Sequence, residues 1–325
     1  MSKWNVYVTR EIPEAGLKAL EEGGASYEMN PDDRVLTRDE LLKSVKGRDA
    51  VLCLLTDKVD GEVLDAAQGA KIFANYAVGY DNVDVQAATE RGMCVTNTPG
   101  VLTETTADLA WALLMSAARR IPESDRYVRA GKFKGWGPML LLGVDIYGAT
   151  LGIVGPGRIG TAVARRGKGF GMEILYCGEN PLPEMEELGA KAVSLQELLT
   201  KSDFVSLHTP LTPETRHMIG AEQFAMMKDS AVLVNTARGP VVDEAALVEA
   251  LRTGAIAGAG LDVFENEPAL APGLAELDRV VIAPHIGSAS VATRSRMAEM
   301  TAENILAALE GRRPENLVNG EVWSD

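Results

Sequence analysis

The feature that most constrains the fold is a glycine-rich turn between an apolar run and a helical pattern. The apolar residues 151–154 lead into GPGRIG at 155–160, after which small and apolar residues recur at helical spacing. In such a turn Gly155 permits the tight bend, Gly157 lets the backbone approach a pyrophosphate, and Gly160 lets the helix pack closely on its strand. The N–H groups and the positive dipole end of that helix then face the phosphates. This order predicts a dinucleotide-binding site, with an ordinary strand–helix turn as the alternative.

Length and charge narrow the class of protein. The chain has 325 residues, which is too long for one compact core and predicts two domains. Hydrophobic residues make up 46% and charged residues 24%, a balance typical of globular proteins. The net charge of −14 argues against nucleic acid and anionic membranes as partners. No apolar run is long enough to span a bilayer, and the first residues lack the apolar core of a signal peptide.

The cysteines indicate the redox environment. Cys53, Cys94 and Cys177 lie far apart and show no CxxC spacing. Cys53 and Cys94 stand in apolar, strand-like runs, so buried free thiols are expected rather than disulfides or a metal site. We therefore expect a cytoplasmic protein without a bound metal.

Strand and helix patterns alternate along the whole chain, before and after the glycine-rich turn. This alternation predicts parallel sheets with helices on both faces, which is a doubly wound α/β architecture. Capping boxes at 37–40 and 194–197 predict two helix starts. The expected strands are 4–8, 50–55, 72–74, 94–96, 151–154, 174–177, 204–207, 231–234, 257–261 and 280–283. The clearest expected helices are 14–20, 38–45, 103–118, 244–251 and 298–309.

The order of these elements also predicts a discontinuous domain. The strands before the glycine-rich turn are enough for a small domain of their own. The apolar helix 103–118 leads into the second domain, and the helix 298–309 is expected to return to the first. We predict a substrate-binding domain of residues 1–99 and 291–325 and a cofactor-binding domain of residues 100–290.

Three charged or titratable residues each follow a predicted strand in the second half of the chain: Arg238, Glu267 and His285. The carboxyl ends of parallel strands line one crevice, so these side chains are expected to face a common cleft. Hydride transfer to a 2-oxo acid needs these three kinds of group. A guanidinium orients the carboxylate, a protonated histidine donates to the developing alkoxide, and a carboxylate favours the protonated histidine. Taken singly, a loop ion pair, a solvated acid and a buried turn histidine are the alternatives.

Other residues are candidates for binding. Val78 and Gly79 follow an expected strand, where their N–H groups are able to hold a carboxylate, with a plain turn as the alternative. Thr106 is either a cleft residue or a helix cap. Trp136 stands in an irregular loop, where a tryptophan is commonly part of a core or an interface. The apolar residues 139–144 are expected to be covered by a second subunit.

Several segments give the sequence a resemblance to a known family: YAVGYDNVD at 76–84, GPGRIG at 155–160, NTARG at 235–239, GLDVFENEP at 260–268 and APHIG at 283–287. The chain resembles the D-isomer-specific 2-hydroxyacid dehydrogenase family, and these segments keep the family's order and spacing. Within the family it is most similar to glyoxylate/hydroxypyruvate reductases, through YAVG at 76–79, YCGENP at 176–181, PHIGSA at 284–289 and the loop of Trp136.

The resemblance implies a fold, a reaction and a set of site residues. The implied fold is a Rossmann cofactor domain inserted in a flavodoxin-like substrate domain. The implied reaction is reduction of glyoxylate or hydroxypyruvate in a homodimer, with Arg238, Glu267 and His285 as the catalytic residues. The residues implied at the substrate are Leu54, Val78, Gly79, Arg238, His285 and, from the neighbouring subunit, Trp136. The residues implied at the cofactor are Thr106, Gly155, Gly157, Arg158, Ile159, Gly160, Glu179, Thr209, Pro210, Thr215, Thr236, Ala237, Asp262 and Gly287.

The chain departs from the family's pattern where the adenine ribose is held. The aspartate that usually ends the second strand of the cofactor unit is replaced by Gly178, with Glu179 just beyond it. Similar NADPH-using reductases place an arginine where Glu179 stands. A carboxylate accepts hydrogen bonds from a ribose diol and repels a 2′-phosphate, so NAD is predicted, with NADP the less favoured cofactor. If Glu179 points to solvent, the enzyme uses both.

Single features of the sequence argue against each of the alternative functions. A 3-phosphoglycerate dehydrogenase is the first alternative, disfavoured because no regulatory domain follows in this sequence. A formate dehydrogenase is expected to have glutamine in place of Glu267, and a phosphite dehydrogenase lysine in place of Val78. A non-enzymatic, NAD-sensing corepressor is the alternative from another class. The acidic charge and the lack of basic tails argue against it.

Overall fold

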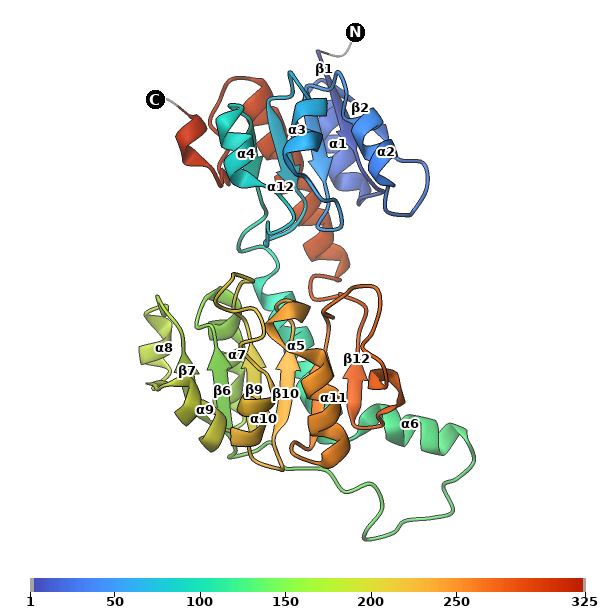
Figure 1. The fold of residues 1–325 in the computed structure, drawn as a ribbon, viewed down its shortest axis with the longest axis vertical. Helices are drawn as coiled ribbons and strands as arrows, with labels where there is room; N and C mark the ends of the chain where they lie inside the picture. The colour runs from blue at the N-terminus through green and yellow to red at the C-terminus, as the bar shows by residue number, and fades with distance from the viewer. Residues whose placement is uncertain (1–2, 324–325) are drawn as a thin grey trace. The chain divides into compact units, whose positions relative to one another are not determined.

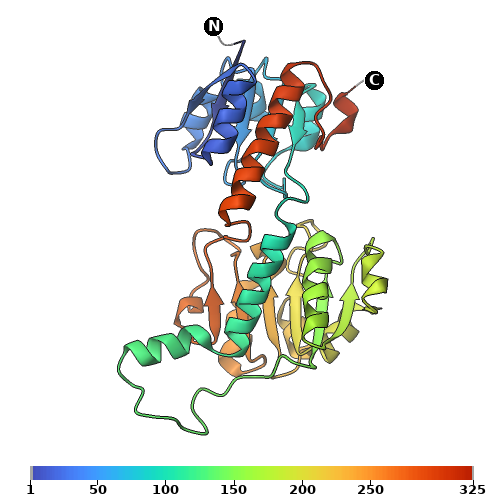
Figure 2. The ribbon, with the colours of Figure 1, turned by 180° about the vertical axis from the view of Figure 1, so that it is seen from behind.

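The computed structural model describes residues 3–323, which form two compact units (Figures 1 and 2). One unit comprises the chain up to Leu102 and from Ser288 onward, and the other comprises Thr103–Gly287. Each unit is built on its own parallel sheet with helices on both faces. The predicted pair of doubly wound α/β domains is confirmed.

The first unit has, in its described part, a five-stranded parallel sheet of order β2-β1-β3-β4-β5. Apolar residues of α1 and α12 bury one face of this sheet, and those of α2, α3 and α4 bury the other. Its strands are β1 (Trp4–Val8), β2 (Ala25–Met29), β3 (Ala50–Cys53), β4 (Ile72–Asn75) and β5 (Cys94–Thr96). Its helices are α1 (Glu14–Glu22), α2 (Arg38–Ser44), α3 (Gly61–Ala66), α4 (Val85–Glu90) and α12 (Val291–Leu309).

The second unit has a seven-stranded parallel sheet among its residues, of order β12-β11-β10-β9-β6-β7-β8. Helices α5 and α7 cover one face, while α9, α10 and α11 cover the other. Its strands are β6 (Thr150–Val154), β7 (Glu173–Cys177), β8 (Lys191–Ala192), β9 (Phe204–Leu207), β10 (Val232–Asn235), β11 (Gly258–Leu261) and β12 (Val280–Ile282). Its helices are α5 (Thr103–Ala118), α6 (Ile121–Arg129), α7 (Arg158–Gly169), α8 (Glu184–Glu187), α9 (Leu195–Lys201), α10 (Ala221–Met226) and α11 (Glu244–Thr253).

The strand order of the second unit sets the place where a ligand is expected. The chain builds outward from β6 through β7 to β8, then returns to β9 on the other side of β6. A doubly wound sheet binds ligands outside the carboxyl ends of its strands at such a switch point. The turn after β6 is the glycine-rich one, so sequence and topology indicate the same edge of the sheet.

Some element bounds differ from those expected. The helix expected at 298–309 begins earlier, at Val291, because Ser290 caps it: its Oγ accepts the N–H of Thr293 at 3.2 Å. The strand expected at 50–55 ends at Cys53, since the next residues form a turn. Strands β2 and β8 were not expected. Both are edge strands with polar residues that face solvent, so their patterns lack the apolar run of a central strand.

Two further properties of residues 3–323 bear on function. None of their helices is both long and apolar enough to cross a membrane. Cys53 and Cys94 are buried free thiols and Cys177 is a half-buried one, and burial raises the pKa of Cys177 to about 11. These thiols are therefore poor nucleophiles at neutral pH.

Candidate active site

The glycine-rich turn has the geometry that its sequence predicts. Gly155 has a φ of 92°, in the left-handed region, and a Cβ there would lie 2.7 Å from the carbonyl carbon of His208. A Cβ on Gly160 would lie 2.2 Å from the oxygen of Gly155, so α7 packs directly against the turn. A Cβ on Gly157 would meet no atom within 4 Å. The space over Gly157 is therefore open to a phosphate.

Helix α7 begins beside this open space. Arg158 and Ile159 are its first residues, and no side chain caps it at Gly157. The N–H groups of the first turn of a helix lack partners within the helix, and the dipole makes this end positive. The start of α7 is thus suited to bind an anion.

Residues on neighbouring strand ends extend this site. Gly178 lies against the turn, since a Cβ there would be 2.7 Å from Cδ of Pro156, and Glu179 follows it with an exposed side chain. After β9, the hydroxyl of Thr215 donates to the carbonyl oxygen of Pro210 at 2.7 Å. The predicted residues of the β7 and β9 loops, which include Thr209, therefore lie at the same edge of the sheet as the glycine-rich turn.

A second group of predicted cofactor residues gathers at Gly287. A Cβ on Gly287 would lie 3.2 Å from Oδ2 of Asp262 and 3.5 Å from Oγ1 of Thr106. Asp262 accepts the N–H of Ile286 at 2.7 Å. Burial raises the pKa of Asp262 to about 6, although that N–H, the nearby His285 and the N–H of Gly287 act in the opposite direction.

The turn after β10 supplies an unsatisfied polar atom. The hydroxyl of Thr236 is buried and has no hydrogen-bond partner among residues 3–323. Next to it, the N–H of Ala237 donates to the side chain of Asn235 at 3.0 Å. A buried polar atom without a partner calls for an explanation, and a bound ligand is one. Together with the open space over Gly157, it fits a site for a dinucleotide.

His285 and Glu267 form a hydrogen-bonded pair in the second unit. Nδ1 of His285 lies 3.0 Å from Oε2 of Glu267, and Oε1 of Glu267 accepts the N–H of Phe264 at 3.0 Å. Burial acts to raise the pKa of Glu267. The hydrogen bond and charge of His285, the Phe264 N–H and the charge of Arg238 outweigh burial and hold this pKa below its ordinary value. Glu267 is therefore ionised at neutral pH.

The backbone fixes the histidine in an uncommon conformation. His285 has a φ of 53°, and its N–H donates to the carbonyl oxygen of Asp262 at 2.8 Å. A non-glycine residue in the left-handed region costs free energy, and such residues cluster at functional sites. With Nδ1 bound to Glu267, the other ring nitrogen, Nε2, is the one suited to donate a proton to a substrate.

Arg238 lies at the end of β10, close enough for its charge to act on Glu267. Its carbonyl oxygen accepts a hydrogen bond from Nδ2 of Asn235 at 2.9 Å, and its Nη1 donates to the oxygen of Ala237 at 2.8 Å. Asn235 thus shapes the turn that carries the guanidinium. The three residues predicted to do chemistry come together in one unit, on three strand ends.

The predicted substrate residues Leu54, Val78 and Gly79 lie in the first unit, at the ends of β3 and β4. The oxygen of Gly79 accepts from Asn75 Nδ2 at 2.9 Å, and the oxygen of Leu54 accepts from Asn82 Nδ2 at 3.0 Å. The N–H groups of Val78 and Gly79 donate no hydrogen bond within residues 3–323. They remain available to an anionic ligand.

Comparison with known proteins identifies the family. Residues 111–287 match the NAD binding domain of the D-isomer specific 2-hydroxyacid dehydrogenases. A glyoxylate reductase of Korarchaeum cryptofilum is 59% identical over 326 residues, which cover 98% of this chain and 97% of that protein. This chain belongs to the D-isomer specific 2-hydroxyacid dehydrogenase family.

Solved structures agree with that membership. The structure of a glyoxylate reductase from Paecilomyes thermophila is 37% identical, with a TM-score of 0.87 over 98% of this chain and 99% of that one. An NADPH-dependent glyoxylate/hydroxypyruvate reductase from Sinorhizobium meliloti, in complex with NADP and malonate, is 35% identical. Its TM-score is 0.86, over 100% of this chain and 99% of that one. The dehydrogenase described here is thus an NAD(P)-binding oxidoreductase of the glyoxylate reductase type.

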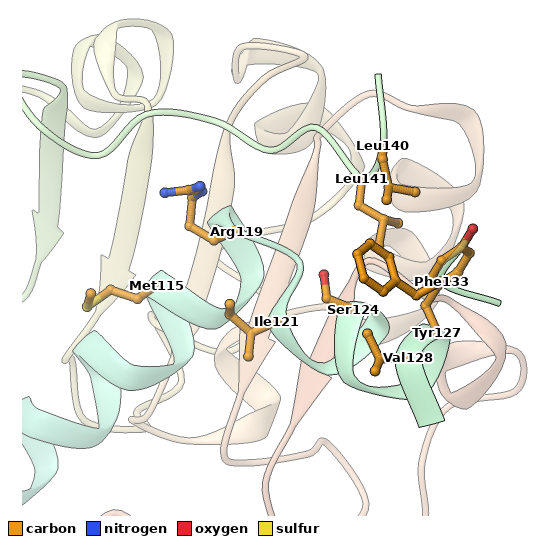
Figure 3. Close-up of a pocket in the computed structure, with 9 residues that line it drawn as sticks. All are labelled: Met115, Arg119, Ile121, Ser124, Tyr127, Val128, Phe133, Leu140 and Leu141. Atoms are coloured by element: carbon orange, nitrogen blue, oxygen red, sulfur yellow. The ribbon is translucent and has the colours of Figure 1, made fainter. Parts of the chain in front are cut away.

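The dehydrogenase also has an exposed apolar surface away from the residues of the candidate active site. A groove of about 570 Å³ lies on α5, α6 and the segment that follows α6. Figure 3 shows the side chains that line it. It is lined by Met115, Arg119, Ile121, Ser124, Tyr127, Val128, Phe133, Leu140 and Leu141. Trp136, on the same segment, is 86% exposed and Met139 is 77% exposed. The exposed tryptophan therefore lies in no core of this chain.

Several residues of these sites were missed from the sequence. Asn75, Asn82 and Asn235 hold the turns that carry the predicted residues, and each makes hydrogen bonds through its amide to main-chain oxygens. The signal available was an asparagine as the last residue of a strand, which holds for Asn75 and Asn235, whereas Asn82 stands in the loop after β4. Glu244, a buried glutamate at the start of α11, gave no such signal.

Proposed function

We propose that this dehydrogenase reduces glyoxylate or hydroxypyruvate to the corresponding 2-hydroxy acid, with NADH as the preferred cofactor. The observation that supports this most is the 3.0 Å contact between His285 and Glu267, in the unit that also contains the glycine-rich turn. The names of the relatives, glyoxylate reductases, support the choice of substrate.

In this mechanism Arg238 binds the carboxylate and polarises the carbonyl of the 2-oxo acid. His285, protonated and held by Glu267, donates its Nε2 proton to the oxygen that becomes the hydroxyl group. Leu54 and the N–H groups of Val78 and Gly79 also bind the substrate. The bound reduced cofactor supplies the hydride. After the proton has left, Glu267 keeps the imidazole oriented, so the reverse reaction finds a base in place.

The proposed cofactor residues lie in the glycine-rich turn and on the strand ends around it. We propose that the N–H groups at Gly157, Arg158 and Ile159 bind the pyrophosphate, between Gly155 and Gly160. Glu179, Thr209, Pro210 and Thr215 would bind the adenosine end. Thr106, Thr236, Ala237, Asp262 and Gly287 would surround the nicotinamide. Glu179 favours NAD because its carboxylate repels a 2′-phosphate.

We also propose that the two domains bind different ligands. Residues 1–99 and 291–325 form the substrate-binding domain, and residues 100–290 form the cofactor-binding domain. Free thiols at Cys53, Cys94 and Cys177 support a reducing compartment, so we place the enzyme in the cytoplasm.

We further propose a homodimer that covers the apolar surface on α6 and the segment after it. Trp136 would enter the substrate pocket of the neighbouring subunit. Support comes from the exposure of large apolar side chains, which monomeric proteins rarely leave in one continuous patch. These side chains include Ile121, Val128, Phe133, Trp136 and Met139.

The test is turnover of NADH by the purified enzyme with glyoxylate and with hydroxypyruvate. We expect both acids to be reduced, and His285→Ala and Arg238→Ala each to lower kcat/KM by at least ~100-fold, the scale for loss of a general acid. A protein that binds NADH but turns over neither acid would instead be a binding protein. A near-wild-type rate in either variant would remove that residue from the mechanism.

A further inference from the structure

A buried glutamate lies behind the His285–Glu267 pair. Glu244 is the first residue of α11, and only 3% of it is exposed. Its Oε1 accepts the N–H of Glu265 at 2.6 Å, and its Oε2 accepts the N–H of Ala271 at 3.2 Å. Glutamate is rarely buried to this degree unless its charge has partners. Here two N–H groups and the N-terminal end of a helix serve as those partners.

The two N–H groups belong to one loop, residues 264–271, that contains Glu267. Glu265 lies two residues before Glu267 and Ala271 lies four residues after it. Inside the loop, the carboxylate of Glu267 accepts the N–H of Phe264. The loop is therefore fixed on both sides of Glu267 by one carboxylate from another element.

Three further contacts hold the same loop. The side chain of Glu265 lies 2.6 Å from Nε2 of His217 and accepts the N–H of Glu244 at 3.4 Å. On the other side, Gly239 packs against the loop backbone so closely that a Cβ there would lie 1.9 Å from the carbonyl carbon of Phe264. Gly239 directly follows Arg238. The turn that contains Arg238 is therefore packed tightly against the loop that contains Glu267.

Helix capping does not account for Glu244. The cap of α11 is Asp243, whose Oδ1 accepts the N–H of Ala246 at 3.0 Å. Both oxygens of Glu244 point instead to the loop. Burial and the charges of Glu265 and Glu267 raise the pKa of Glu244, while the two N–H groups lower it. Burying an acid near two other acids is unfavourable, and here the two hydrogen bonds of that acid fix the geometry of the loop.

We infer that Glu244 is a positioning residue that holds Glu267 against Nδ1 of His285. This inference rests on the proposed function, in which the protonated His285 is the proton donor. Without Glu244 the loop moves, the carboxylate no longer stays at 3.0 Å from the ring, and the protonated imidazole loses part of its stabilisation. The other charged groups facing the pair are Asp262 and Arg238.

The experiment compares Glu244→Gln with Glu249→Gln, a matched change on the exposed face of the same helix. The glutamine keeps the size of Glu244 but turns one acceptor into a donor that faces an N–H group. For glyoxylate reduction we expect kcat/KM to fall about 10- to 100-fold in Glu244→Gln, the scale for a misplaced catalytic group. The pH above which kcat/KM declines is expected to move lower, while Glu249→Gln matches the wild type in both.

A direct reading of the histidine makes the test independent of turnover. The NMR titration midpoint of the His285 ring, in the enzyme with NADH bound, is expected at lower pH in Glu244→Gln than in Glu249→Gln. If Glu244→Gln does not fold, Glu244→Asp, which keeps the charge but withdraws it by one methylene, is expected to shift both readouts in the same direction by less.

The outcomes separate the two proposals. A Glu244→Gln enzyme with lower stability or lower rate but unchanged pH dependence and histidine titration would make Glu244 merely structural and would overturn the inference. If the wild-type enzyme reduces neither glyoxylate nor hydroxypyruvate, the proposed function fails and the inference fails with it. Normal wild-type turnover together with identical Glu244→Gln and Glu249→Gln profiles would reject the inference alone.

Discussion

At the scale of single residues, His285 is held at two places. Its ring is bound through Nδ1 to Glu267, and its backbone N–H is bound to the carbonyl oxygen of Asp262. The first contact orients the ring and the second holds a left-handed backbone conformation that a histidine adopts only at a cost. These two contacts orient the proposed proton donor before a substrate binds.

We propose that a single residue, Glu179, also sets the choice of cofactor. Replacing Glu179 by arginine exchanges an exposed negative charge beside the glycine-rich turn for a positive one. We expect Glu179→Arg to move the preference from NADH toward NADPH, because the guanidinium binds a 2′-phosphate that the carboxylate repels. Steady-state kinetics with both cofactors measure this ratio, and a wild-type enzyme with a lower KM for NADPH than for NADH would contradict the assignment.

Asp57 gives a pH-dependent test of stability. Its Oδ2 accepts both the hydroxyl of Thr9 at 2.5 Å and the N–H of Leu54 at 2.8 Å, and burial raises its pKa. The folded protein therefore holds this proton more tightly than the unfolded chain, whose Asp has a pKa of about 3.9. Since the folded state binds more protons above about pH 3.9, stability from this group falls as the pH rises.

In Asp57→Asn the amide oxygen is able to accept both hydrogen bonds, and the buried charge is absent. We expect the stability of the variant relative to the wild type to improve as the pH rises from about 4 toward neutrality. The scale is about 1.4 kcal/mol for each pH unit by which the folded pKa is raised. Urea denaturation at acid and neutral pH measures the difference. A constant difference at all pH values would mean that the pKa of Asp57 is unchanged by folding.

The sequence predicted the positions of the three proposed catalytic residues better than those of the residues around them. Arg238, Glu267 and His285 were expected at strand ends because parallel strands point their carboxyl ends to one edge. Glu244 was not expected, since an acidic residue at the start of a helix is common and its burial depends on a loop that is distant in the sequence. Which backbone N–H groups meet a carboxylate is decided by tertiary packing.

At the scale of elements, the glycines of the glycine-rich turn have different structural roles. Gly160 serves packing, because a Cβ there would clash with the turn at 2.2 Å, whereas Gly157 faces open space. The two positions therefore predict different consequences for the same substitution, one on the fold and one on the ligand.

We expect Gly160→Ala to destabilise the enzyme by about 1–3 kcal/mol, the usual cost of overpacking. Gly157→Ala is expected to leave the Tm of the protein without cofactor nearly unchanged and to weaken NADH binding at least ~10-fold, because the new methyl group occupies the phosphate site. Thermal unfolding and fluorescence titration with NADH measure the two effects. Equal NADH affinity in wild type and Gly157→Ala would show that the phosphates bind elsewhere.

Element bounds could be predicted where apolar runs and caps coincide. The helix Thr103–Ala118 was predicted with its observed bounds, because it is apolar on nearly every side, and the capping box at Thr37 and Glu40 is present as expected. Strands β2 and β8 were not predicted from the sequence, because edge strands need no continuous apolar run. Helix α12 starts earlier than expected because its first turns are polar, and a tertiary core buries Thr293 and Met297.

At the scale of the whole molecule, the alternation of strands and helices was enough to predict two doubly wound sheets. The sequence could not provide the subunit arrangement, because an apolar segment such as 139–144 looks alike in a core and in an interface. In the structure Met139 and Trp136 are exposed. The distinction therefore comes from tertiary structure, and it supports the proposed homodimer.

The proposed homodimer predicts what a charge placed in the apolar groove does to the oligomeric state. Phe133→Asp, at a side chain that lines the groove, is expected to convert a dimer into a monomer, since an unpaired carboxylate buried in an interface is costly. Val35→Asp, at an exposed valine of the first unit, is the control and is expected to stay dimeric. Sedimentation velocity gives the mass of each. A wild-type protein that sediments as a monomer would rule out the homodimer.

The most direct measurement of the proposed chemistry is the pH dependence of kcat/KM for glyoxylate reduction in Glu267→Gln, beside Glu276→Gln as an exposed control. Loss of the carboxylate at 3.0 Å from His285 is expected to lower kcat/KM about 100-fold and to shift its decline to lower pH. Glu276→Gln is expected to match the wild type. A Glu267→Gln enzyme with the wild-type rate and the wild-type pH profile would contradict the assignment of His285 and Glu267 as the proton-donating pair.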